Sequence, residues 1–306
     1  MFIELTACIK VIRPDSRAVF PYSNSLYIDG ERQTLIDAGS GRVYQHLPPE
    51  KIETLLFSHY HFDHVHGWPY FSQAQFMAGE EERWAFEDET EYHLSAGYQY
   101  WEELMGQKKS MNWNRTAELP DDVLVKPGFQ PIALAGTFKD GDRLDMGQSY
   151  CVALHTPGHT PGHYSFYFPE EKILFAGDLD LSPRGPWYGG AYSDFDDLLQ
   201  SVERLIQLNP DVLVSSHRRV FEGDVRPLLR QYIDIALERE RKILQFLDQP
   251  RTFREIMSLD LSVPGDGSEH ELFWNRMMIK KHLERFCKHE WIYKREDGCY
   301  VRYKEG

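Results

Sequence analysis

The chain has 306 residues, 42% of them hydrophobic, which is enough for one large domain and a small one beside it. Its net charge of −14 argues against a protein whose main task is to grip nucleic acid non-specifically. No apolar run reaches the roughly 18 residues of a membrane span. The first residues lack a secretion-signal pattern, and the four cysteines show no CxxC spacing, so we expect a cytoplasmic protein without a disulfide framework.

Strand-like runs alternate with helical periodicity along residues 1–223. The run at 54–58 ends abruptly in the polar segment SHYHFDHVHG, and residues 195–208 have the spacing of an amphipathic helix with Ser193 or Asp194 as N-cap. The other predicted strands are 2–11, 25–29, 34–37, 149–155, 164–168, 173–176 and 211–215, with a hairpin turn at Asp29-Gly30. This alternation favours a layered α/β domain.

Residues 79–130 interrupt the alternation with an aromatic and acidic segment that we expect to be mostly helical. Its large rings are Trp84, Phe86, Tyr92, Tyr98, Tyr100, Trp101 and Trp113. The segment is either a lid over the site or peripheral packing, and the sequence leaves both open.

The chain changes character at residue 224, where we place the boundary between a domain of residues 1–223 and a small helical domain of residues 224–306. The predicted elements are helices 226–247, 252–259 with Thr252 as N-cap, and 269–288, a loop at 264–268, and a hairpin at 291–303 that turns at Asp297-Gly298. This is the order of a winged-helix module. Residues 224–306 carry 16 basic and 15 acidic side chains, and the rest of the chain carries 18 and 33.

Side chains of the kind that bind metals follow several predicted strands. His59 and His61 form an i, i+2 pair on one face of extended backbone, and the next turn adds Asp63 and His64. A pair of zinc ions needs about six or seven protein ligands of this type. Later strands end near the further candidates His159, Asp178 and His217. The sequence therefore predicts a two-metal site at one edge of a sheet.

The motif HxHxDH at 59–64, followed in order by TPGHTPGH, GD and SSH, resembles the motifs of the metallo-β-lactamase superfamily. Asp37 in LIDAG matches the first motif of that family, where the aspartate supports the ligands. The resemblance spans residues 1–220 and implies a four-layer αββα sandwich.

The resemblance also implies which residue holds which metal. His59, His61 and His159 would hold the first metal, Asp63, His64 and His217 the second, and Asp178 would bridge the two. A histidine at position 61, where the diiron flavoprotein branch has a glutamate, favours two Zn²⁺ ions, although Fe or Mn in one site is compatible with these ligands.

Several other histidines need an assignment. The family pattern selects His159 over its neighbours His155 and His163, and we expect His163 to orient a ligand or contact substrate. His66 is expected to be structural or to line the site, and Asp180 to hydrogen-bond a ligand. The rest lack motif context and are expected on the surface or in the core: His46, His93, His270, His282 and His289.

The expected reaction is hydrolysis. Two metals about 3.5–4 Å apart lower the pKa of a shared water from about 16 toward 7 and so supply a bridging hydroxide. Asp63 is expected to orient this group or accept its proton. The resemblance to lactonases makes Tyr188 and Tyr192 candidates for assisting the substrate, with loop packing as the competing interpretation. No GxSxG motif is present for a serine nucleophile.

Two substrate classes remain open. A small ester, thioester or lactone is favoured, as in glyoxalase II and the lactonases, although the chain lacks a basic cluster near the motifs that would hold a glutathione carboxylate. The alternative is a single-strand endoribonuclease or other phosphodiesterase, because the C-terminal domain resembles that of the lactamase-beta-like-2 group. Its basic side chains are Arg276, Lys280, Lys281, Arg285, Lys288, Lys294 and Arg295. Nucleic acid is not favoured, no membrane partner is expected, and the C-terminal domain is equally compatible with a homodimer contact or a cap on the site.

Overall fold

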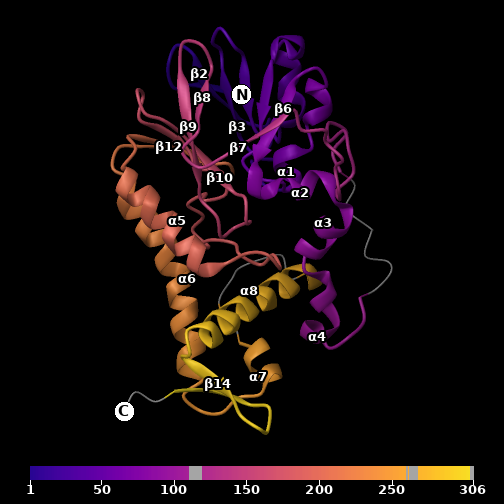
Figure 1. Ribbon diagram of the computed structural model, residues 1–306, viewed down its shortest axis with the longest axis vertical. Coiled ribbons are helices and arrows are strands. Elements are labelled where there is room, and N and C mark those ends of the chain that lie inside the picture. Colours follow the sequence, from indigo (N-terminus) through magenta and orange to yellow (C-terminus); the bar gives the residue numbers. More distant parts are fainter. Residues whose placement is uncertain (110–118, 260, 262–267, 304–306) are drawn as a thin grey trace.

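The computed structural model describes residues 1–109, 119–259, 261 and 268–303, and its centre is a pair of β-sheets (Figure 1). Within these residues the first sheet runs in the order β1 (Phe2–Glu4), β2 (Ile9–Ile12), β3 (Ser25–Ile28), β4 (Thr34–Ile36), β5 (Thr54–Leu56), β6 (Gln75–Gly79) and β7 (Gly136–Phe138). The second runs in the order β13 (Val220–Glu222), β12 (Val212–Val214), β11 (Ile173–Phe175), β10 (Tyr164–Phe168), β9 (Tyr150–His155) and β8 (Arg143–Asp145).

The core between the sheets explains why the strand sequences are so apolar. Phe166 and Phe168 of β10 point into the cluster shared by both sheets, whereas Tyr167 between them packs against the helices outside. A strand alternates its side chains between two faces, so a strand covered on both faces is apolar throughout.

Helices cover both outer faces and complete four layers. α5 (Phe195–Leu208) and α6 (Arg226–Phe246) cover the second sheet, and α1 (Phe62–Val65) with short 3₁₀ turns such as η3 (Trp68–Phe71) covers the first. Asp194 caps α5 by accepting a hydrogen bond from the Asp197 amide, as predicted. The expected αββα sandwich is confirmed. No helix among the described residues is long and apolar enough to cross a membrane.

The predicted first strand was too long. A turn separates β1 from β2, because the Thr6 hydroxyl accepts a hydrogen bond from the Ile9 amide and the Leu5 amide bonds to the Ile9 carbonyl. A threonine side chain that bonds to nearby backbone competes with the strand ladder in this way.

The C-terminal segment, residues 224–306, follows its predicted elements closely. After α6 come α7 (Phe253–Met257), α8 (Glu269–Lys288), and an antiparallel pair of β14 (Ile292–Lys294) and β15 (Tyr300–Arg302). Thr252 caps α7 with a capping box. Of the loop predicted at 264–268, only Ser268 is described, and the winged-helix likeness stays a prediction.

The segment 79–130 packs against α8. Its helices are α2 (Trp84–Glu87), α3 (Glu89–Ser95) and α4 (Trp101–Met105). The Trp101 ring stacks on Phe273 of α8 with 4.9 Å between centroids, and Figure 1 shows α8 running beneath the sandwich from α6 toward α4. The predicted Trp113 lies outside the described residues.

Candidate metal centre

The seven predicted ligand side chains meet where the strands end. His59 follows β5, and His61 stands directly before α1, which carries Asp63 and His64. Asp178 follows β11 and His217 follows β12. Because β11 and β12 are parallel partners, their carboxyl ends bring these two loops together.

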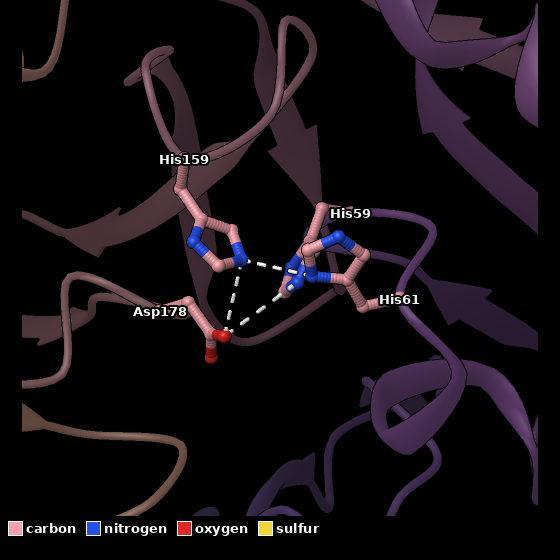
Figure 2. Close-up of side chains that lie close together, drawn as sticks. All are labelled: His59, His61, His159 and Asp178. Carbon is pink, nitrogen blue, oxygen red and sulfur yellow. Dashed lines mark hydrogen bonds and ion pairs between the residues drawn. The ribbon is translucent and has the colours of Figure 1, made fainter. Parts of the chain in front are cut away.

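The first group consists of three histidines and one carboxylate (Figure 2). His159 Nε2 lies 2.9 Å from His61 Nδ1 and 3.2 Å from Asp178 Oδ2. His59 Nε2 lies 3.8 Å from the same carboxylate oxygen. Four ligand atoms of types that zinc prefers thus face one small volume.

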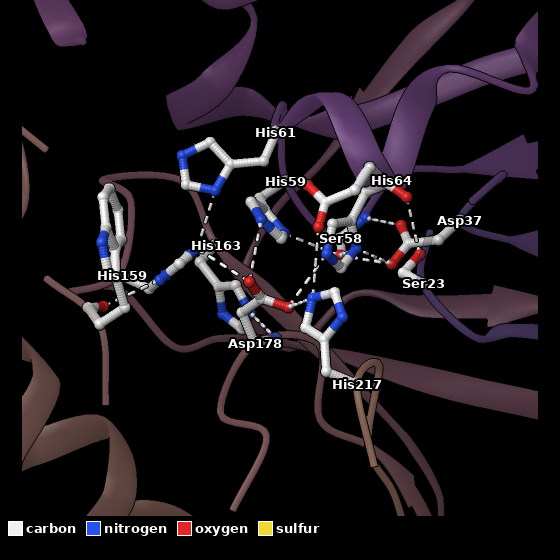
Figure 3. Close-up of polar contacts among 12 residues, drawn as sticks. Ser23, Asp37, Ser58, His59, His61, His64, His159, His163, Asp178 and His217 are labelled. Carbon is white, nitrogen blue, oxygen red and sulfur yellow. Dashed lines mark hydrogen bonds and ion pairs between the residues drawn. The ribbon is translucent and has the colours of Figure 1, made fainter. Parts of the chain in front are cut away.

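The second group consists of Asp63, His64 and His217. The other oxygen of Asp178, Oδ1, is 3.0 Å from His64 Nε2 and 3.1 Å from His217 Nε2, while Asp63 Oδ2 is 3.4 Å from His217 Nε2. Asp178 therefore turns one oxygen toward each group, as Figure 3 shows. This is the geometry that a bridging ligand requires.

In three of the histidines, the ring nitrogen that faces away from the site already lies within hydrogen-bond distance of an oxygen. His159 Nδ1 lies 3.0 Å from the Trp187 carbonyl oxygen, His217 Nδ1 3.2 Å from that of Ala18, and His64 Nδ1 2.7 Å from Asp37 Oδ2. A carbonyl oxygen can only accept, so Nδ1 of His159 and of His217 carries a proton, and Nε2 is the nitrogen of each ring that would bind a metal.

The inward-facing atoms fit a metal pair. His59 Nε2, His64 Nε2 and Asp178 Oδ1 are buried and make no hydrogen bond. A buried polar atom without a partner is costly, and several that converge on one volume indicate a missing cation. Burial lowers the pKa of His59 and His61 well below 6.5, which leaves both imidazoles neutral and able to bind a metal.

Asp178 controls the charge of the second group. Burial alone would lower the pKa of His217, but the Asp178 carboxylate outweighs it and raises the pKa to about 9. A metal ion in this place would supply the positive charge that the protonated imidazole otherwise provides, so proton and metal compete.

Two further residues hold the ligands in place. Asp37 accepts hydrogen bonds from the amide and hydroxyl of Ser58, next to His59, besides its contact with His64. His163 Nε2 accepts the amide hydrogen of Asp178 at 3.0 Å, and a side chain at Gly177, which has a φ of 55°, would strike that imidazole. The expectation that His163 orients a ligand agrees with this contact.

The neighbouring histidines lie outside the ligand set. His155 Nε2 bonds to the Pro161 carbonyl, and His66 is fully buried with its ring packed against Phe62. Asp180, which was expected to hydrogen-bond a ligand, also lies outside the ligand set, and burial raises the pKa of its carboxyl to about 6.

Neither candidate tyrosine points its hydroxyl at the ligands. Tyr188 is fully buried and its hydroxyl lies 2.8 Å from His282 Nε2 of α8. Tyr192 donates to Glu91 of α3 at 2.6 Å. The Tyr188 contact joins its loop to α8, which fits the competing interpretation of loop packing, and a role for Tyr188 in assisting the substrate stays a prediction. Tyr192 is 36% exposed, and its hydroxyl contacts the segment 79–130.

Trp187, which was not among the predicted site residues, is an aromatic residue that contacts two of the candidate ligands. Its ring centroid lies 5.5 Å from that of His61 and 5.3 Å from that of His159, and it also packs against Trp274 of α8 at 5.4 Å. A tryptophan that directly precedes a tyrosine in a Gly- and Pro-rich segment carries no local signal that separates it from the tyrosines of that segment.

A cavity of about 740 Å³ opens from the metal centre toward α8. Its wall includes His159, Asp178 and Trp187 on one side and Trp274 and Met278 on the other. His270, expected on the surface or in the core, also lines it. Since none of the described residues of 79–130 lines this cavity, the covering element is α8, in the C-terminal segment for which a cap on the site was one of the interpretations left open.

Comparisons with known proteins agree with this geometry. Residues 18–217 match the family described as the metallo-beta-lactamase superfamily. A beta-lactamase-like protein 2 homolog of Caenorhabditis elegans is 23% identical over 274 residues, which are 85% of this chain and 76% of that protein. A hydroxyacylglutathione hydrolase of Francisella philomiragia is 36% identical over 92 residues, 30% of this chain and 34% of that protein.

Among solved structures, a metallo-beta-lactamase family protein from Thermus thermophilus superposes with a TM-score of 0.75 at 23% identity. The superposition covers 98% of this chain and 100% of that one, so the fold extends to the C-terminal helices.

Proposed function

The chain belongs to the metallo-β-lactamase superfamily of metal-dependent hydrolases, and on that premise we propose that it cleaves a small ester, thioester or lactone at a two-metal site. The observation that carries the proposal is the cavity of about 740 Å³ between α8 and two members of the first candidate metal group, His159 and Asp178. Cavities of roughly 300–1,000 Å³ suit small organic ligands. The Francisella relative is named for hydrolysing an acyl derivative of glutathione, which supports an acyl substrate.

In this proposal the seven side chains hold two metals. His59, His61 and His159 hold one, Asp63, His64 and His217 hold the other, and Asp178 bridges them. Zinc suits these nitrogen and carboxylate ligands. A bound pair would lower the pKa of a water molecule toward neutrality and polarise the acyl oxygen.

The chain's own residues then orient the ligands and move a proton. The Trp187 and Ala18 carbonyls fix the ring orientation of His159 and His217. We assign proton transfer to Asp63, whose carboxylate lies beside His217 and is only partly buried. As water adds to the acyl carbon, the bond to the leaving oxygen or sulfur breaks, and the proton that Asp63 accepted passes to the leaving group.

The nucleic-acid alternative receives less support from the C-terminal segment. Its basic side chains are largely engaged within the chain: Arg276 donates to the Leu104 carbonyl, Lys281 to that of Ala191, and Arg285 binds Asp196 and Glu240. A phosphate-binding face needs cations that are free to contact the backbone of the nucleic acid.

The test is a substrate panel with the zinc-loaded full chain. Acyl thioesters, 4-nitrophenyl esters, lactones and a bis(4-nitrophenyl) phosphodiester are compared by kcat/KM. We expect turnover of an acyl substrate that disappears in His61→Ala. Preferential turnover of the phosphodiester, together with RNA binding that weakens steeply as salt increases, would instead favour the nuclease.

A further inference from the structure

Arg239 of α6 is a buried cation at the wall of the cavity. Its side chain is 3% exposed, yet it lies among the residues that line the cavity, together with Trp187, Trp274 and Met278. α6 also contacts the metal centre, because the Tyr232 hydroxyl donates to the Asp178 carbonyl at 3.1 Å. Positions 232 and 239 are seven residues apart and so share a face of the helix.

The positive charge of Arg239 has no carboxylate partner among the described residues. Its guanidinium donates through Nη1 to the Pro186 carbonyl at 3.2 Å and through Nη2 to the Arg184 carbonyl. Nε is buried and makes no hydrogen bond. A guanidinium has five N–H donors, so these two carbonyls satisfy part of its hydrogen-bonding capacity and none of its charge.

The acids nearest along the sequence are occupied elsewhere. Glu240 accepts from Arg285 and lies 3.4 Å from His282 Nδ1, while Glu238 pairs with Arg241. Within the cavity wall, Asp178 belongs to the metal centre, Asp180 accepts a hydrogen bond from the Ser182 amide, and Glu271 has contacts of its own. An ionised side chain that is buried without a counter-ion is strongly unfavourable, so a partner of opposite charge is expected to enter the cavity.

From this geometry we infer that Arg239 binds a carboxylate at the far end of the substrate, so that the enzyme prefers acyl substrates with a second, anionic end. The inference rests on the proposed hydrolase function and adds a substrate class to it. The scissile acyl group would lie at the metal centre, the connecting chain against Trp187 and Trp274, and the carboxylate at the guanidinium. Of the two arginines in the cavity wall, Arg184 is exposed and Arg239 is buried, so we place the carboxylate at Arg239, whose planar guanidinium suits a carboxylate.

This assignment changes one expectation from the sequence. No basic cluster lies near the ligand motifs, which counted against a substrate carboxylate. The structure brings a cation to the cavity from position 239, far from every ligand in the sequence and adjacent to the cavity only because α6 packs on the second sheet.

The first experiment compares 4-nitrophenyl hemiesters of succinate, glutarate and adipate with the uncharged 4-nitrophenyl valerate, using the zinc-loaded full chain. We expect at least one hemiester to exceed valerate in kcat/KM by about tenfold or more, since a charge-assisted hydrogen bond is worth roughly 1.5–3 kcal/mol. If the wild-type chain hydrolyses valerate as well as every hemiester, the inference is wrong, whatever any variant does.

Variants then identify the cation. In Arg239→Gln the preference for the best hemiester over valerate should fall about tenfold, whereas Arg239→Lys should keep part of it. Arg241→Gln is the matched control, because Arg241 is exposed on the same helix. An equal loss for charged and uncharged esters in Arg239→Gln would mean that Arg239 only holds the loop at Arg184 and Pro186.

A binding measurement separates this inference from the proposed function. Calorimetry with glutarate and with the neutral glutaramide needs no turnover. Binding of glutarate that weakens in Arg239→Gln but not in Arg241→Gln supports the carboxylate site even if no ester is hydrolysed. Equal glutarate affinity in all three proteins would overturn it even if esters are hydrolysed.

Discussion

Two clusters of buried polar groups differ in how they are satisfied. At the strand ends, buried atoms of His59, His64 and Asp178 make no hydrogen bond and face one another. Where α8 meets α5 and α6, Arg285 binds both Asp196 and Glu240. The first cluster is incomplete without a ligand, whereas in the second the cation and both carboxylates are paired. Arg239, whose buried Nε makes no hydrogen bond, resembles the first cluster.

The largest loss of activity should come from removing a side chain of the candidate metal centre. His61→Ala or Asp63→Ala should lower kcat/KM by about 10³-fold or more, because one loses a metal ligand and the other the proposed proton acceptor. Circular dichroism should show the fold retained. Full activity of either variant would refute the assignment of the site.

Removing the metals tests the same region without mutation. Dialysis against a chelator should abolish turnover and lower the unfolding temperature, and zinc should restore both. A ligand present at about 1,000 times its Kd stabilises the folded state by about 4 kcal/mol. Stability that is indifferent to zinc would mean that the unsatisfied atoms do not hold an ion.

Substitutions in the cluster of Arg285 and Asp196 should change the free energy of unfolding and leave catalysis unchanged. Asp196 accepts from Arg285 at 2.6 Å, His289 at 2.8 Å and Lys288 at 3.0 Å. Burial works against the charge of Asp196, but the hydrogen bond from Arg285 and the other cations outweigh it and hold the pKa of this carboxyl well below its usual range. We expect Asp196→Asn to lower the free energy of unfolding by about 1–2 kcal/mol.

The pH dependence of that loss has a defined sign. A carboxyl with a lowered pKa in the folded state stabilises the fold above its ordinary pKa of about 3.9 and loses this contribution as the pH falls below it. The difference between wild type and Asp196→Asn should therefore be full at pH 7 and shrink below pH 4. Asp197→Asn, exposed on the same turn, is the control, and an equal effect of both would refute the role of the cluster.

Glu82 should respond with the opposite sign. It is fully buried, and burial raises the pKa of its carboxyl to about 8. The unfolded chain releases this proton near pH 4 and the folded chain keeps it until about pH 8, so stability falls as the pH rises between them. Glu82→Gln has no proton to release, so its free energy of unfolding relative to wild type should be higher at pH 8 than at pH 5.

Denaturant unfolding at the two pH values measures this difference. Glu102→Gln, on the exposed side of α4, should change neither value. A gain in Glu82→Gln that is equal at pH 5 and pH 8 would show that proton release is not its cause.

Local signals in the sequence were sufficient for elements that carry their own period and caps. The boundaries of α5 and α8 agree with the predictions, because each has an amphipathic repeat and a capping residue, Asp194 or Ser268. The seven candidate ligands were found because each follows an apolar strand in a recognisable motif. The turn that divides β1 from β2 was missed, because it depends on one threonine hydroxyl.

The wall of the cavity could not be predicted in this way. Trp274, His270 and Arg239 lie on helices whose sequence patterns describe only how they bury their apolar faces. Their position beside His159 results from docking of α8 and α6 onto the sandwich, and no local pattern encodes that docking. The contact of the loop residue Tyr188 with His282 could not be predicted for the same reason, since His282 is supplied by α8.

The docking of α8 has a consequence for how such a protein can change over time. The groups proposed to break the bond lie on α1 and on loops within the first 217 residues, whereas Trp274 and Met278 of the cavity wall lie on α8, later in the sequence. Substitutions on the inner face of α8 can change which substrates enter the cavity without changing the residues that are proposed to cleave them. Diversification of substrate range and preservation of catalysis are thereby assigned to different stretches of the gene.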